Sequence, residues 1–178
     1  MFIHEMTESD CLNTLAHSRF GRLACSHENQ PYIVPFYFVY ENSYLYGFTT
    51  PGQKVEWMRS NPLVCVELDD VVNVTEWMSI IIFGSYEELL ETQEDKKYPD
   101  LRRPTNSSSA CREVSQTPLE EHHNLRQHAH ALLQQHAEWW EPGATSNSHR
   151  HSHPFKPVFY RIHIDRISGR RVTPSRGD

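Results

Sequence analysis

The chain has 178 residues, of which 22% are charged and 38% hydrophobic, and its formal net charge is −6. This length suits one domain with a core of ordinary size, and the composition excludes a disordered chain and a membrane protein. The negative charge argues against nonspecific binding of nucleic acid, which needs a positive field over the phosphates. Histidine is unusually frequent, with 12 residues against 11 prolines and 7 glycines.

Hydrophobic stretches and cysteine positions indicate in which cellular compartment the protein is expected. No stretch approaches the roughly 20 apolar residues of a membrane span, and residues 1–10 lack the basic and apolar regions of a signal peptide. The four cysteines stand at positions 11, 25, 65 and 111, without a CxxC pair or metal-ligand spacing. We therefore expect a reduced, cytoplasmic protein, and four structural half-cystines are the alternative.

The first 50 residues alternate short apolar runs with turn residues, which is typical of β-strands. A short helix is expected after Thr7, whose hydroxyl can cap it. A strand over Gly21–Cys25 and a long aromatic run over Pro31–Tyr40 follow, and Pro35 within that run indicates a bulge or an edge strand. A tight reversal at residues 41–43 then makes a hairpin with residues 44–48.

The next 40 residues complete the predicted barrel. Val55 and Met58 share one face of a helix that ends at Asn61-Pro62, because a residue before proline is pushed out of helical geometry. Strands are expected over residues 63–68 and from about 77 to 90, with a turn that starts at Asp69-Asp70. Five or six strands and two short helices within this length indicate a compact antiparallel barrel, with a core over about residues 1–91.

The second half of the chain is expected to add polar segments, one helix and one strand to this barrel. Residues 92–117 form a polar excursion, residues 118–140 a helix with one apolar stripe, and residues 144–157 a His-rich loop. A final strand over residues 158–166 alternates well enough to rejoin the sheet. The sequence therefore predicts a single domain over residues 1–178.

The segment Phe48-Thr-Thr-Pro-Gly-Gln-Lys54 carries the clearest chemical signal. It lies at a strand-to-helix junction, and a helix start presents free N–H groups and a partial positive charge, which suits a phosphate. The hydroxyls of Thr49 and Thr50 can donate hydrogen bonds to such a group. Gly52 allows the backbone to approach closely, and Lys54 adds a positive charge. A capped turn with a solvated lysine is the alternative, since neither a Walker loop nor a GxGxxG motif is present.

Five blocks of sequence occur in the order and spacing of one known family. They are Gly21-Arg-Leu-Ala24, Tyr32-Ile-Val-Pro-Phe36, Leu45-Tyr-Gly-Phe-Thr-Thr-Pro-Gly-Gln-Lys54, Asn61-Pro-Leu-Val-Cys65 and Trp77-Met-Ser-Ile-Ile-Ile-Phe-Gly84. The chain thus resembles the pyridoxamine 5′-phosphate oxidase-like split-barrel flavoproteins, and most closely the nitroimidazole-resistance reductase-like branch. The later blocks Trp139–Gly143 and Phe159–Asp165 also resemble members of that branch.

The resemblance implies a mainly β protein with flanking helices: an antiparallel, Greek-key-like split β-barrel that binds FMN. It further implies a homodimer with the flavin in a cleft between two barrels, a small-molecule substrate, and neither nucleic acid nor membrane as partner. The flavin ring is expected against the second long strand and the phosphate on the loop that ends in Lys54. The residues assigned to the cofactor are Tyr32, Ile33, Val34 and Pro35; Phe48, Thr49, Thr50, Gly52, Gln53 and Lys54; and Trp77 and Ser79.

The chain departs from the oxidases of this family in two places. Their phosphate loop carries an Arg-Lys pair where this chain has Gln53 and Lys54, so one bidentate charge is missing, and Arg22 or Arg59 could replace it. The residues Arg161-Ile-His163 match the Arg-x-His pattern of the substrate-binding signature of these oxidases. The same pattern also fits the solvent-exposed face of an ordinary strand. We therefore expect a reductase that passes electrons or hydride from a reduced nicotinamide through FMN to a small organic acceptor, a nitro compound for example. No residue is assigned a catalytic role.

The histidine-rich tract offers an alternative function. His149-Arg-His-Ser-His153 places three imidazoles on alternate residues, which can bind a transition metal if the segment is extended. Structural zinc sites have fixed spacing and usually cysteine ligands, both absent here, so we expect a solvated tract and no metal site. Some split-barrel relatives bind haem through a C-terminal histidine loop, and others use a deazaflavin. A non-enzymatic haem- or metal-binding protein and a deazaflavin protein are therefore the alternatives.

Overall fold

The computed structural model describes residues 2–90, 118–136 and 157–173. The predicted polar excursion over residues 92–117 lies outside the described residues, and so does the His-rich loop over residues 144–157 except for Pro157. Trp139 and Trp140 also lie outside them.

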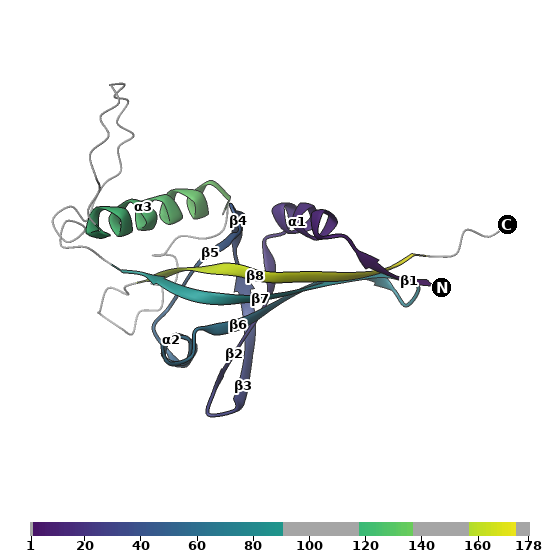
Figure 1. Cartoon of the computed structure of the whole chain (residues 1–178), viewed down its shortest axis with the longest axis horizontal. Coiled ribbons are helices and arrows are strands. Elements are labelled where there is room, and N and C mark those ends of the chain that lie inside the picture. The colour runs from purple at the N-terminus through teal and green to yellow at the C-terminus, as the bar shows by residue number, and fades with distance from the viewer. Residues whose placement is uncertain (1, 91–117, 137–156, 174–178) are drawn as a thin grey trace, which may run out of the picture.

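The described chain is mainly antiparallel β structure with three helices, as predicted (Figure 1). Its elements are β1 (Phe2–Met6), α1 (Glu8–His17), β2 (Phe20–His27), β3 (Gln30–Tyr37), β4 (Val39–Glu41), β5 (Tyr44–Thr49), α2 (Gln53–Ser60), β6 (Leu63–Asn73), β7 (Glu76–Leu89), α3 (Pro118–His136) and β8 (Val158–Thr173).

The strands form one sheet in the order β3-β2-β6-β7-β8-β5-β4, with β1 paired to β8 beyond this path. No ladder among the described residues joins β3 to β4, so the sheet is coiled but not closed. Strand β7 pairs along most of its length with β6 on one side and β8 on the other. The helices α1 and α3 pack along β8, and α2 packs beside β2 (Figure 1).

Local sequence signals account for several elements. Thr7 caps α1 by accepting a hydrogen bond from the backbone N–H of Asp10 at 3.1 Å, as expected. The reversal between β4 and β5 is made by Asn42 and Ser43, both with positive φ, a conformation that asparagine tolerates well. Pro35 lies on β3, which is an edge strand, a position where a residue without a backbone N–H is tolerated.

Other elements differ from the predictions. The turn predicted at Asp69-Asp70 is wrong, because Asp69 pairs with Ser79 and the ladder continues into the β6–β7 hairpin. The final strand runs to Thr173 rather than to residue 166, because β1 and β7 both pair with its second half. Helix α3 is described as far as His136, and the remainder of the predicted helix, residues 137–140, lies outside the described residues. The predicted strand over residues 31–40 is divided into β3 and β4 at Phe38, and β1 was not expected at all.

Two apolar clusters form the core. The larger one lies on the inward face of the sheet and includes residues of α1 and α2, such as Leu15 and Met58. Within it, the ring of Tyr160 stacks on Phe36 at 5.8 Å between centroids and lies 5.3 Å from the ring of Tyr86. The smaller cluster lies under α3 and consists of Val39, Tyr46, Leu89, Ala129, Leu133 and Phe159.

Gly84 sits at the bulge where β7 and β8 change register, and there the two backbones approach closely. A Cβ at this position would lie 2.2 Å from the backbone oxygen of His163, which cannot move without breaking the ladder. We therefore expect Gly84→Ala to lower the free energy of unfolding by about 3 kcal/mol, measured by urea denaturation. Gly52→Ala is the control, because its Cβ would meet nothing within 4 Å. Equal stability of the two variants would contradict the close approach.

Candidate functional site

The predicted phosphate loop joins the end of β5 to the start of α2. Gly52 is the N-cap residue of α2 and provides no side-chain hydrogen bond to the helix. Its carbonyl accepts from the backbone N–H groups of Val55 and Glu56, at 2.9 and 3.2 Å. The N–H groups of the first helical turn therefore have no side-chain cap, and space is open around Gly52. Val55 and Met58 are both buried, as predicted, and hold the helix against the core.

Lys54 is the functional group that this loop brings inward. Its side chain is partly buried, and this burial lowers the pKa of its ammonium group, while the nearby Cys25 acts in the opposite direction. No ion pair or hydrogen bond joins Lys54 to another described residue. A buried ammonium group without an anion is unfavourable, so an anionic ligand at this position would relieve that cost.

Strand β3 carries the residues predicted to face the flavin ring. Tyr32 and Val34 point toward the core, whereas Ile33 and Pro35 point outward. Because β3 is an edge strand, the backbone groups on its free side have no ladder partner among the described strands. The ring of Trp57, on α2, lies 5.6 Å from that of Tyr32, so the helix that starts at the phosphate loop is packed against this strand.

Phe48 and the two threonines lie at the end of β5. Phe48 packs toward Phe159, with 6.2 Å between ring centroids, at the margin of the cluster under α3. Thr49 is half-buried and Thr50 is exposed. The structure thus keeps Thr49, Thr50, Gly52 and Lys54 in one loop, and the contact of Phe48 with a cofactor stays a prediction.

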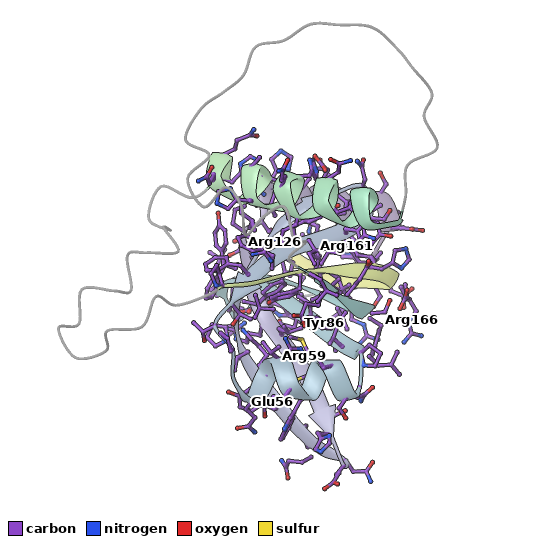
Figure 2. All side chains as sticks on the ribbon, turned by 90° about the vertical axis from the view of Figure 1, so that its left-hand side faces the viewer. Glu56, Arg59, Tyr86, Arg126, Arg161 and Arg166 are labelled. Atoms are coloured by element: carbon purple, nitrogen blue, oxygen red, sulfur yellow. The ribbon has the colours of Figure 1, made fainter. Side chains whose placement is uncertain are left out.

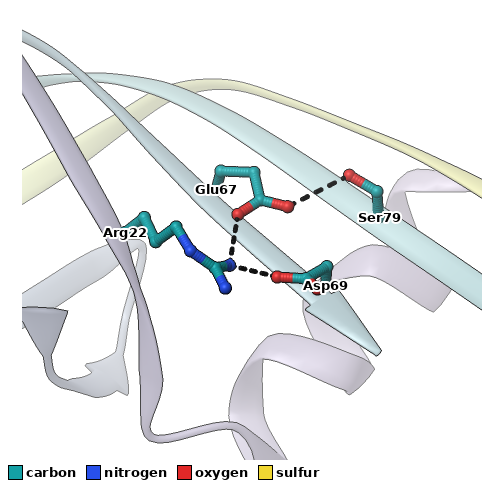
Figure 3. Close-up of polar contacts among 4 residues, drawn as sticks. All are labelled: Arg22, Glu67, Asp69 and Ser79. Atoms are coloured by element: carbon teal, nitrogen blue, oxygen red, sulfur yellow. Dashed lines mark hydrogen bonds and ion pairs between the residues drawn. The ribbon is translucent and has the colours of Figure 1, made fainter. Parts of the chain in front are cut away.

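Trp77 and Ser79 lie on the outward face of β7, as their spacing predicts. The Ser79 hydroxyl donates to Glu67 at 3.5 Å, and the same carboxylate lies 3.0 Å from the Arg22 guanidinium. Arg22 also pairs with Asp69 (Figure 3). This acidic cluster of Arg22, Glu67 and Asp69 joins β2 to β6 and was missed from the sequence, because its members are 45 and 47 residues apart.

Neither arginine that was expected to replace the missing phosphate-loop arginine is available. Arg22 is shared between two carboxylates. Arg59 makes a bidentate pair with Glu88, with Nε–Oε2 and Nη2–Oε1 distances of 2.6 and 2.7 Å. Figure 2 shows Arg59 reaching from α2 toward Tyr86, whose hydroxyl also donates to Glu88 at 3.1 Å. These contacts anchor α2 to β7, so Arg59 positions the helix that carries Lys54.

The Arg59–Glu88 pair gives a testable pH dependence. Hydrogen bonds from Arg59 lower the pKa of the Glu88 carboxyl below its ordinary value of 4.5. A carboxyl with a depressed pKa stabilises the fold above that value and loses its contribution as the pH falls. We expect Glu88→Gln to lower the free energy of unfolding by about 1–2 kcal/mol at pH 7. The difference from wild type should become smaller as the pH falls from 7 toward 3 in urea denaturation.

Glu56 provides the matched control for this prediction, because it lies on the exposed side of the same helix. Glu56→Gln should leave the unfolding free energy nearly unchanged at both pH values. A Glu88→Gln difference that was undiminished at pH 3 would show that the charge on Glu88 is not what stabilises α2.

The described residues contain no group of three histidine, cysteine or acidic side chains that could hold a metal ion, and His149 to His153 lie outside them. Cys11, Cys25 and Cys65 are free thiols. In the described part of the chain, no helix has the length and apolar character needed to cross a membrane. A cytoplasmic location stays a prediction.

Comparison with known proteins places the chain in a family. The family model described as pyridoxamine 5′-phosphate oxidase matches residues 7–132, which include β2 to β7 and most of α3. The chain belongs to this family. The predicted resemblance is therefore confirmed.

Individual relatives extend the match to nearly the whole chain. An uncharacterized protein of Rhizobium meliloti (strain 1021) is 32% identical over 171 residues, covering 96% of this chain and 95% of the relative. A FAD-binding protein of Mesorhizobium loti is 35% identical, with a TM-score of 0.66 and coverage of 97% of this chain and 100% of that one. A candidate 5-nitroimidazole antibiotic resistance protein of Bacteroides thetaiotaomicron shares the fold, with a TM-score of 0.56 at 17% identity and coverage of 96% and 89%.

Proposed function

We propose that this protein binds a flavin and uses it as an oxidoreductase. The observation that carries the proposal is Lys54: a partly buried ammonium group without an anionic partner among the described residues, beside an uncapped helix start. Both features favour an anion. The relative from Mesorhizobium loti, a FAD-binding protein, supports a flavin phosphate as that anion.

The residues present fit the parts of a flavin mononucleotide. Lys54, the hydroxyls of Thr49 and Thr50, and the first N–H groups of α2 would hold the phosphate. The free edge of β3, at residues 32–35, offers backbone donors and acceptors for the polar rim of the flavin ring. Gln53 is exposed and offers an amide where the oxidases carry arginine.

A bound flavin supplies two-electron chemistry at its N5 atom, and the protein supplies binding, orientation and electrostatics. With only Lys54 on the loop, the phosphate is held by one formal charge. We propose that the protein takes electrons from a reduced nicotinamide and delivers them to a small organic acceptor, a nitro compound being one candidate. None of the described residues is assigned a proton-transfer role.

We further propose a homodimer, with the flavin between the two copies. The outward face of the sheet carries large apolar side chains that belong to neither core cluster and are between 42% and 67% exposed. They are Phe20, Ile33, Leu63, Val71 and Phe83. An apolar patch of this kind on a sheet marks an interaction surface. A second copy that covers it would enclose the cofactor residues Ile33, Trp77 and Ser79.

We propose FMN as the flavin, because one lysine and one helix start suit a single terminal phosphate. The similarity to a FAD-binding protein makes FAD the second candidate. A visible spectrum of the purified protein, with mass identification of the released chromophore, distinguishes them. A flavin spectrum and an FMN or FAD mass are the expected result. A Soret band would indicate haem instead, and failure to retain or bind any flavin would contradict the proposal.

Lys54 is tested directly by substitution. If its ammonium group neutralises the phosphate, Lys54→Ala should weaken flavin binding by about 1–3 kcal/mol, which is the range for losing a charge-assisted hydrogen bond. Titration of the cofactor-free variants with FMN, followed by fluorescence quenching, measures this difference.

The control for the Lys54 experiment is Lys54→Arg, which keeps the positive charge and should retain most of the affinity. The melting temperature of each cofactor-free variant checks that the fold is intact. An unchanged dissociation constant in Lys54→Ala would mean that Lys54 is a structural lysine and that the phosphate lies elsewhere.

A further inference from the structure

Helix α3 lies on the outward face of the sheet, over β8, β5 and β7 (Figure 1). Ala129 and Leu133 of this helix are fully buried and belong to the smaller apolar cluster beneath it. Phe48, the first residue of the segment that forms the phosphate loop, packs against the same cluster. The helix therefore packs beside the end of β5 from which that loop leaves the sheet.

The strand ladders place the side chains under α3 in one row. Phe159 is opposite Phe48 in the β5–β8 ladder and opposite Leu89 in the β7–β8 ladder. Paired residues point to the same face of a sheet, so Leu89, Phe159 and Phe48 lie in line, with Phe159 in the middle. The ladder between β5 and β8 ends one residue later, at Thr49 and Val158, and the phosphate loop begins there.

Two polar side chains of α3 contact the ring of Phe159. The guanidinium of Arg126 lies over this ring, 4.7 Å from its centroid, and its Nη1 donates to the backbone oxygen of Leu89 at 3.0 Å (Figure 2). The imidazole of His130 meets the same ring edge-on, with 5.6 Å between centroids. A cation–π contact, an aromatic contact and a hydrogen bond to the adjacent strand thus fix one ring from the helix side.

The ring of Phe159 in turn packs against that of Phe48, with 6.2 Å between centroids. Phe48 immediately precedes Thr49 and Thr50, whose hydroxyls are proposed to hold the phosphate. Donors in a binding site have to be held within about 0.5 Å of their bonding positions by the residues that pack around them. Phe48 and Phe159 are the packed residues that connect these threonines to α3.

We infer that Arg126 is a positioning residue of the phosphate loop: from α3 it fixes Phe159, and Phe159 fixes Phe48 and the threonines that follow. His130 supports the same ring. The inference rests on the proposed flavin function and deepens it, because the docking of α3 becomes a condition for tight binding of the phosphate. Coupling between two sites is reciprocal, so a phosphate held by the loop also stabilises the docked helix.

The test compares the affinities of cofactor-free variants of the full chain for FMN and for riboflavin, which lacks the phosphate. Arg126→Met removes the cation and keeps a long side chain. It should weaken FMN binding at least about fivefold and leave riboflavin binding unchanged, whereas a general loss of structure weakens both. Phe159→Leu, which changes no charge, should have the same effect. Isothermal titration calorimetry measures both affinities, and the melting temperature shows that each variant folds.

The double variant distinguishes positioning from the charge of Arg126 itself. If Arg126 acts on the phosphate by long-range attraction, Arg126→Met weakens FMN binding by the same factor whether residue 159 is Phe or Leu. If Arg126 acts through the ring, this substitution has little further effect in the Phe159→Leu background. Gln134→Ala is the control, because Gln134 is exposed on the same helix and its loss should leave both affinities unchanged.

Hydrogen exchange gives a second readout, which does not depend on affinity. In wild type, bound FMN should slow the exchange of the backbone amides of α3 more than bound riboflavin does, by a factor of about five or more, because the coupling is reciprocal. In Phe159→Leu the two ligands should give equal exchange rates.

A preference for FMN over riboflavin that is as large in Arg126→Met or Phe159→Leu as in wild type overturns the inference and leaves the proposed flavin function intact. A full effect of Arg126→Met in the Phe159→Leu background overturns it as well. A wild-type protein that binds FMN no more tightly than riboflavin contradicts the proposed phosphate loop, and the inference with it.

Discussion

The alternation of side chains along β7 is the constraint on which the rest of the structure depends. Because β7 pairs with β6 and β8 on its two sides, its residues cannot shift by one position without turning the core outward. Ile80, Ile82 and Tyr86 are buried on one face. Ser79 and Ile81 lie on the other, where the acidic cluster and the apolar patch are found. One register thus sets both the core and the surface that we assign to the dimer.

The candidate cofactor site contains a charged side chain whose burial a bound anion would make less costly. Lys54 is partly buried at the start of α2, and this burial lowers the pKa of its ammonium group. The rest of the helix compensates for this cost through the bidentate Arg59–Glu88 pair and the packing of Trp57 on Tyr32. The structure therefore holds a partly buried cation on an anchored helix, so the position of this group is fixed by its surroundings.

Local signals in the sequence predict much of this architecture. The cap at Thr7, the turn before Tyr44 and the edge position of Pro35 each follow from the chemistry of a few adjacent residues, and all three are found. The phosphate loop was predicted as one segment, because its residues are consecutive. These local structures could therefore be predicted, while the binding of a phosphate by the loop stays a prediction.

Contacts between distant residues could not be predicted in the same way. The polar sequence at Asp69-Asp70 resembles a turn, but the ladder with β7 keeps it extended. Strand β1 has little apolar alternation and forms because β8 offers a free edge. Arg22 and Arg59 were expected to help with a phosphate, and only the folded chain shows that carboxylates 45 and 29 residues away bind them. Each of these outcomes depends on pairing across the sheet.

The measurement that tests the account most directly compares the affinities of the cofactor-free wild-type protein for FMN and for riboflavin, by isothermal titration calorimetry. The two ligands share the flavin ring and the ribityl chain and differ only in the phosphate that Lys54 and the start of α2 are proposed to hold. The account predicts that FMN binds at least about tenfold more tightly than riboflavin. Equal affinities would show that the phosphate is not bound at this loop and would contradict it.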